Sequence, residues 1–85
     1  MQVTDKDIRH AIESLLESRQ LSATICPSEA ARALNPKEWR PLMPQVRAVA
    51  VTMARDRALV ISQAGHAVDP DGPLRGPIRL GRPGP

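Results

Sequence analysis

The chain has 85 residues, 41% of them hydrophobic, and a net charge of +3, which is typical of one small domain. It lacks Phe and Tyr and has one Trp, so the core must be aliphatic, and a single-strand binder built on aromatic stacking is disfavoured. Residues 35–58 carry five Lys or Arg against two acids. This local excess of positive charge is compatible with a polyanionic partner but does not require one.

Cysteine content and hydropathy indicate a cytoplasmic protein. The single Cys26 cannot form an internal disulfide, which suits a reducing compartment. The N-terminal residues do not show the basic and then apolar pattern of a signal peptide. No purely apolar run is longer than Ala48–Val51, which is far too short to cross a membrane, so no membrane partner is expected.

The first expected element is a helix over residues 5–19. Thr4 is a favourable N-cap, and Asp7 three residues later completes a capping box. Helical spacing places four aliphatic side chains on one stripe: Ile8, Ile12, Leu15 and Leu16.

Two further helices are expected, joined by a turn. The first begins at residue 27 or 28 and ends near residue 34, with Pro27 at a favourable first position. Pro41 and Pro44 would interrupt a continuous second helix, because proline removes a backbone donor. We therefore expect a short helical turn over 36–40, a break, and a main helix over 44–55.

A β-hairpin is predicted over residues 59–68 from the alternation of side chains. Its turn is Ala64-Gly65. Because Ala fits poorly to a positive φ, we expect a type I turn with Gly65 left-handed and a bulge. Residues 23–25 could add a short third strand to this hairpin.

The composition changes at Asp69, and the remaining residues hold five of the nine prolines and four of the five glycines. We expect no helix there. Residues 76–80 could lie extended against the domain, because Ile78 and Leu80 alternate with a charged residue. This places a single domain at residues 1–80 and a flexible tail at 81–85.

The element order predicts a winged helix-turn-helix, mainly α, with three helices and a two- or three-stranded wing. The expected core is aliphatic and draws on every element. It consists of Ile8, Ile12, Leu15, Ala31, Leu34, Val46, Val49, Ala50, Met53, Leu59 and Ile61.

Four segments carry a resemblance to a known family: ICPSEAARAL, WRPLMPQVR, ISQAGHAVDP and RGPIRL. They cover most of the chain from Ile25 to Leu80. They resemble a small bacterial family that is described only as a domain of unknown function and is grouped with winged-helix proteins. The resemblance implies the fold and supplies no activity or catalytic residues.

Binding of duplex DNA, which could serve regulation, is the function that such a fold favours. The helix after the turn usually enters the major groove, and the wing touches the backbone. We expect three side chains to reach bases, namely Gln45, Arg47 and Thr52. We expect three others to contact phosphates, namely Arg40, Arg55 and His66.

A protein–protein interaction module is the alternative. Ala48 and Val51 lie on the outer face of the 44–55 helix, where a DNA-reading helix often carries polar or basic side chains. Trp39 is expected to fill the space between the two helices of the motif. Cys26 is expected to be a small buried residue rather than a nucleophile.

No pattern indicates catalysis. Two His and one Cys are the only N or S metal ligands, and no CxxC or HExxH spacing is present. No Gly-rich phosphate loop occurs. We therefore expect no enzyme activity, no metal or other cofactor, and no small-molecule ligand.

Overall fold

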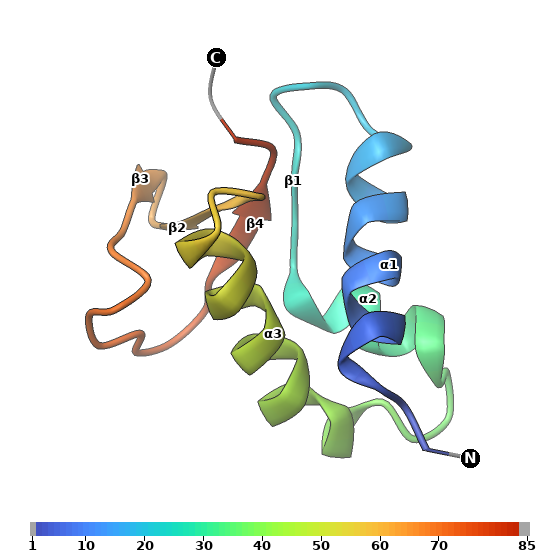
Figure 1. Cartoon of the computed structure of the whole chain (residues 1–85). Coiled ribbons are helices and arrows are strands. Elements are labelled where there is room, and N and C mark those ends of the chain that lie inside the picture. Colours follow the sequence, from blue (N-terminus) through green and yellow to red (C-terminus); the bar gives the residue numbers. More distant parts are fainter. Residues whose placement is uncertain (1, 84–85) are drawn as a thin grey trace.

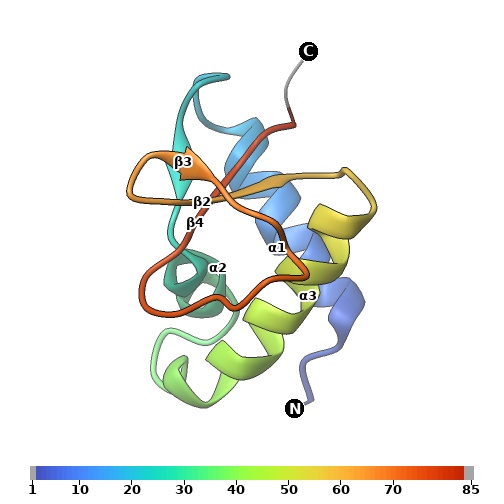
Figure 2. The same ribbon diagram turned by 90° about the vertical axis from the view of Figure 1, so that its left-hand side faces the viewer.

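A computed structural model describes residues 2–83, which form three α-helices, one short 3-10 helix and a four-stranded antiparallel sheet (Figure 1). The helices gather on one side of the sheet, and the aliphatic core lies between these two layers (Figures 1 and 2). None of the helices within residues 2–83 has the length and apolarity needed to span a membrane.

The first helix, α1 (Asp5–Glu17), starts at the predicted capping box. The Thr4 hydroxyl accepts from the Asp7 amide at 3.1 Å, and the Asp7 carboxylate accepts from the Thr4 amide at 3.0 Å. The helix ends two residues earlier than expected. Its C-cap is Ser18, whose hydroxyl donates to the Leu15 carbonyl at 2.8 Å and so takes up an unpaired helix-end acceptor.

The second helix, α2 (Pro27–Leu34), has the predicted bounds, and α3 (Met43–Arg55) begins one residue before its predicted start. The helical turn predicted over 36–40 is wrong. Asn35 does accept from the Glu38 amide at 3.1 Å, but residues 36–38 are bends. The helical turn that does form is a 3-10 helix, η1 (Arg40–Leu42), which leads directly into α3.

The two prolines explain this connection. Pro41 lies in the first positions of η1 and Pro44 in the first positions of α3. A helix needs no backbone donor at these positions, so each proline is tolerated there without a lost hydrogen bond. The prolines thus begin two separate helical pieces, η1 and α3. The first piece starts at Arg40 and not at residue 36, as was predicted.

The sheet has four strands rather than the two or three expected: β1 (Thr24–Ile25), β2 (Val60–Gln63), β3 (His66–Ala67) and β4 (Arg79–Gly81). Their order is β1-β4-β2-β3, and every neighbouring pair is antiparallel.

The C-terminal strand β4 is internal, so β1 pairs with β4 and not with the predicted hairpin. The register aligns Leu80 with Ile25 on one side and Ile61 on the other, and all three are buried. Because side chains alternate across a strand, these three form one apolar row facing the helices. The segment predicted only as an extended chain therefore completes the sheet.

The flexible tail was predicted to begin at residue 81, but Gly81 belongs to β4. Gly81 is a buried strand residue opposite both Thr24 and Val60. A Cβ atom at Gly81 would lie 3.2 Å from the Thr24 methyl group, so the position favours glycine. Arg82 donates from Nε and Nη2 to the Leu16 carbonyl at 3.2 and 2.9 Å. Residues 84–85 lie outside the described residues.

The hairpin turn also differs from its prediction. Ala64 has φ of 50° and Gly65 has φ of 82°. Two positive values between strands separated by two residues indicate a type I′ turn, not a type I turn with a bulge. The twist of the flanking strands favours this turn, and that preference outweighs the poor fit of Ala64 to positive φ.

Nine of the eleven predicted core residues are buried. The other two, Leu15 and Leu34, are half-buried and pack at the margin of the core. The buried hydrophobic residues that were not predicted are Leu16, Ile25, Ala30, Ile78 and Leu80. Two of these come from the C-terminal segment, which adds more to the core than its composition indicated.

Leu80→Ala should strongly destabilise the fold, because it removes the centre of the buried row. We expect a loss of about 2–5 kcal/mol in the free energy of unfolding, measured by urea denaturation. Leu21→Ala is the matched control, since Leu21 is 76% exposed and its truncation should change stability by about 0.5 kcal/mol or less. Equal effects of the two substitutions would contradict the central position of β4.

Candidate nucleic-acid interface

Gln45 and Thr52, two of the predicted base contacts, lie on the side of α3 that faces α1. The Gln45 amide donates from Nε2 to the Val3 carbonyl at 3.1 Å and to Asp5 Oδ1 at 2.9 Å. Thr52 is exposed, and its hydroxyl donates to the Ala48 carbonyl at 3.3 Å. Gln45 therefore ties α3 to the start of α1 and does not project outward.

Arg47 lies on the opposite flank, because two residues along a helix correspond to a rotation of about 200°. Its Nη2 donates to the carbonyls of Leu74 and Gly76, both at 3.3 Å. Arg55, at the end of α3, forms an ion pair with Asp71 in the same loop. The loop between β3 and β4 thus occupies both arginines that were predicted to contact nucleic acid from α3.

The other two predicted residues are exposed but far apart in the chain. His66 lies in β3, next to the hairpin turn. Arg40 lies in η1, with its guanidinium carbon 4.6 Å from the centroid of the Trp39 ring. The six predicted residues consequently do not form one surface around α3.

A cluster of cationic side chains does form around Trp39. Arg32 of α2 places its guanidinium carbon 4.4 Å from the centroid of the same ring. Arg32 and Arg40 therefore both lie within cation–π distance of the same ring. Lys37 is exposed in the intervening turn. We call these four residues, Arg32, Lys37, Trp39 and Arg40, the Trp39 cluster.

The charges of the Trp39 cluster are not paired with acids in the part of the chain that the structure describes. Among residues 2–83, no ion pair involves Arg32, Lys37 or Arg40. Glu38 is the only acid between residues 30 and 55. A guanidinium that stacks by its face keeps its five N–H donors in the plane, pointing away from the ring. The two arginines lie against the ring, and no ion pair within residues 2–83 competes with an external anion for them.

Three members of this cluster, Arg32, Lys37 and Trp39, were not predicted as site residues. Trp39 is half-buried and packs against the core, so it fills space as expected, in addition to contacting the two arginines. A sequence signal did exist, because three basic residues and one acid surround the single Trp within residues 32–40. That signal indicates local charge but not stacking.

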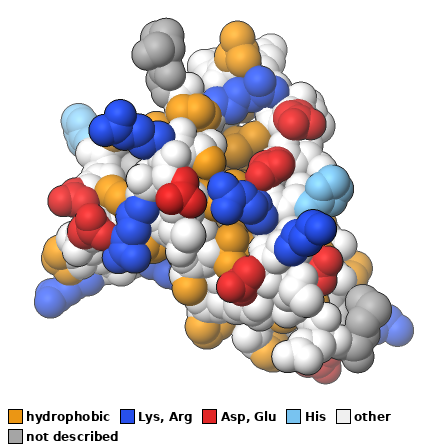
Figure 3. Space-filling model, in the orientation of Figure 1, with side chains coloured by type: hydrophobic (Ala, Val, Ile, Leu, Met, Phe, Trp, Pro, Cys, Tyr) orange, Lys and Arg blue, Asp and Glu red, His pale blue; other side chains and the backbone are white. Residues whose placement is uncertain are grey.

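The face formed by α1 and α3 has a different character. Figure 3 shows basic and acidic side chains interspersed over it, with hydrophobic atoms between them. A hollow of about 410 Å³ lies between the two helices, lined by Asp5, Lys6, Arg9, Ala48, Val49 and Thr52. This face therefore lacks the uniform positive charge that favours a polyanion.

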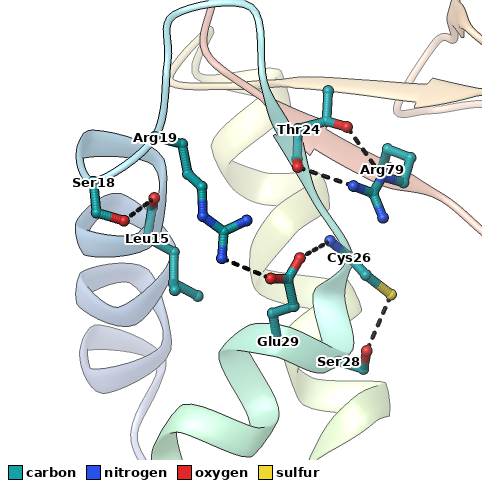
Figure 4. A network of polar contacts seen from close by, with 8 residues as sticks. All are labelled: Leu15, Ser18, Arg19, Thr24, Cys26, Ser28, Glu29 and Arg79. Carbon is teal, nitrogen blue, oxygen red and sulfur yellow. Dashed lines mark hydrogen bonds and ion pairs between the residues drawn. The ribbon is translucent and has the colours of Figure 1, made fainter.

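A second polar network joins the end of α1 to the start of α2 (Figure 4). Arg19 donates to Glu29 Oε1 at 2.8 Å, and the Cys26 amide donates to Glu29 Oε2 at 2.8 Å. Cys26 is half-buried rather than buried as predicted, because it caps α2 and its sulfur accepts from the Ser28 hydroxyl. Both oxygens of Glu29 are engaged, so the network is structural.

These contacts lower the pKa of Glu29 below its ordinary value of 4.5, first through the hydrogen bond from Arg19 and then through the Cys26 amide. Within residues 2–83, no three His, Cys, Asp or Glu side chains converge closely enough to hold a metal ion.

The Glu29 carboxylate should make stability depend on acid pH. Because the pKa of Glu29 is lower in the folded state, its carboxylate stabilises the fold at pH values above the unfolded pKa of about 4.5. This stabilisation is lost as the pH falls through the pKa of the folded state. Glu29→Gln should therefore be less stable at neutral pH and should lose less stability on acidification. Urea midpoints against pH would measure this, with Glu17→Gln as a control outside the network. Identical pH profiles for Glu29→Gln and the wild type would contradict the assignment.

Comparison with known proteins adds a family but no activity. The model of the DUF3253 family, described as a protein of unknown function, matches residues 5–83. No curated protein matches the chain. The expected relationship to a domain family of unknown function is thus confirmed, and the chain belongs to the DUF3253 family.

Proposed function

We propose that this protein binds duplex DNA and that the Trp39 cluster contacts the phosphate backbone. The observation that carries the proposal is the pair of arginines that lie against the Trp39 ring and form no ion pair within residues 2–83. Phosphate contacts from Arg and Lys supply most of the affinity of DNA-binding proteins.

The arrangement of elements supports the same proposal. α2, a turn, α3 and the β2–β3 hairpin follow one another in the order of a winged helix-turn-helix. We assign α2 and α3 to the helix-turn-helix and the hairpin to the wing, with His66 beside its tip. The internal β4 is an addition to that plan. The proposed role is binding without catalysis, and it could be regulatory.

Arg40→Ala should weaken DNA binding and reduce its salt dependence. Loss of one phosphate contact lowers the slope of log K against log salt by about 0.9. Anisotropy of a labelled duplex, titrated between about 50 and about 200 mM salt, would measure the slope.

Arg55→Ala is the control that matches Arg40→Ala in charge and residue type. Because Asp71 already neutralises Arg55, its removal should change the slope less. Circular dichroism would verify that both variants fold. Equal slopes for the two variants would contradict the assignment to the Trp39 cluster, and absence of binding by the wild type at about 50 mM salt would contradict the function.

Binding of a protein partner is the second candidate, and the hollow between α1 and α3 favours it. Exposed Ala48 and buried Val49 give the hollow an apolar base, and the charges of both signs at its rim suit a protein better than a polyanion. Val51, which was predicted to share this surface, is half-buried against the core. Its replacement by an acid would therefore also disturb folding.

Ala48→Glu is the substitution that tests this second candidate. It places a charge in the hollow at an exposed position, so folding should be retained. If copies of the chain associate through the hollow, sedimentation should show oligomers for the wild type and monomers for the variant. A wild type that remains monomeric at millimolar concentration would exclude self-association as the use of this hollow.

A further inference from the structure

We infer that the protein binds duplex DNA through its backbone and does not discriminate between base sequences. This inference rests on the proposed function and specifies its substrate class. Sequence is read in the major groove by side chains that combine donors and acceptors or donate twice, above all Arg, Lys, Asn and Gln. Recognition of a base sequence would therefore require such side chains to be exposed on α3 or on the hairpin.

The exposed side chains of α3 offer little for base recognition. They are Pro44, Ala48, Thr52 and Arg55. Pro44 and Ala48 have no side-chain donor. The Thr52 hydroxyl donates to the helix backbone, and the Arg55 charge is paired with Asp71. A helix in the major groove would therefore present an almost uniformly apolar and neutralised surface to the bases.

The two long polar side chains that could read bases are held within the protein. An amide NH₂ has two hydrogens, and Gln45 uses both, one towards the Val3 carbonyl and one towards Asp5. Only its oxygen remains, and an acceptor alone cannot form the paired contact with adenine. Arg47 is half-buried, and its Nη2 contacts two carbonyls of the loop between β3 and β4.

The hairpin cannot supply the missing specificity through the minor groove. Proteins that read this groove use Arg, Lys, Asn or Gln. Residues 58–74 contain one such side chain, Gln63, whose Nε2 donates to the carbonyls of Arg75 and Pro77 at 2.7 and 3.4 Å. The hairpin turn is Ala64-Gly65, with His66 as the adjacent polar residue. Exposed cations that form no ion pair within residues 2–83 include those of the Trp39 cluster and Arg57, which follows α3, and such groups suit phosphates.

A selection from a random pool tests this inference directly. Duplexes with about 20 randomised base pairs would be offered to the intact protein at about 50 mM salt, and the retained fraction sequenced. Three single duplexes of equal length, one AT-rich, one GC-rich and one mixed, would then be titrated by anisotropy. We expect no enriched motif and dissociation constants that agree within about threefold, against a ratio of about 10³ or more for sequence-specific proteins.

A Thr52→Ala variant is included because Thr52 is the exposed uncharged polar side chain of α3. Its affinity should equal that of the wild type on every duplex. An enriched motif bound about 100-fold more tightly, with the preference lost in Thr52→Ala, would overturn the inference and leave the proposed function standing. Failure of the wild type to retain any duplex would overturn both, so the two failures are distinguishable.

Discussion

The buried row formed by Ile25, Leu80 and Ile61 is the contact on which the rest of the structure depends. Leu80 lies at its centre, on a strand that pairs with β1 on one side and β2 on the other. Without β4, the two-residue β1 would have no partner, and the helices would lose the apolar surface against which they pack. The pairing of Thr24 with Gly81 also joins segments far apart in the chain, so the fold closes only when its C-terminal part is in place.

The fixed position of α3 has a functional consequence. Gln45 holds its first turn to the start of α1, while Arg47 and Arg55 hold its other flank to the loop between β3 and β4. These contacts satisfy the polar groups that a recognition helix would otherwise offer to bases. The cations left for an external anion include Arg32 in α2 and Lys37 and Arg40 in the connection to α3, and both arginines lie against the Trp39 ring.

Much of the fold follows from periodicity and capping. The stripe from Ile8 to Leu16 and the Thr4 capping box locate α1, and Pro27 locates the start of α2. The role of β4 was harder to predict, because Pro and Gly around it resemble a tail and only Ile78 and Leu80 indicate a buried strand. Its position between β1 and β2 depends on tertiary pairing, which local patterns do not encode.

The candidate site was less predictable than the fold, because it depends on tertiary contacts of individual polar side chains. Helical spacing shows that Gln45 and Arg47 lie away from the core. It does not show that backbone carbonyls of Val3, Leu74 and Gly76 lie within reach of them. The stacking of Arg32 and Arg40 likewise depends on side-chain geometry between α2 and η1.

Chemical-shift mapping of the backbone amides and the Trp39 indole N–H, on titration with a duplex DNA, tests the central claim most directly. The account predicts that the largest changes fall within residues 32–40 and include the indole N–H, because the stacked arginines would turn towards phosphates. Changes centred on the outer face of α3 or on the hairpin, with an unaltered indole signal, would contradict it.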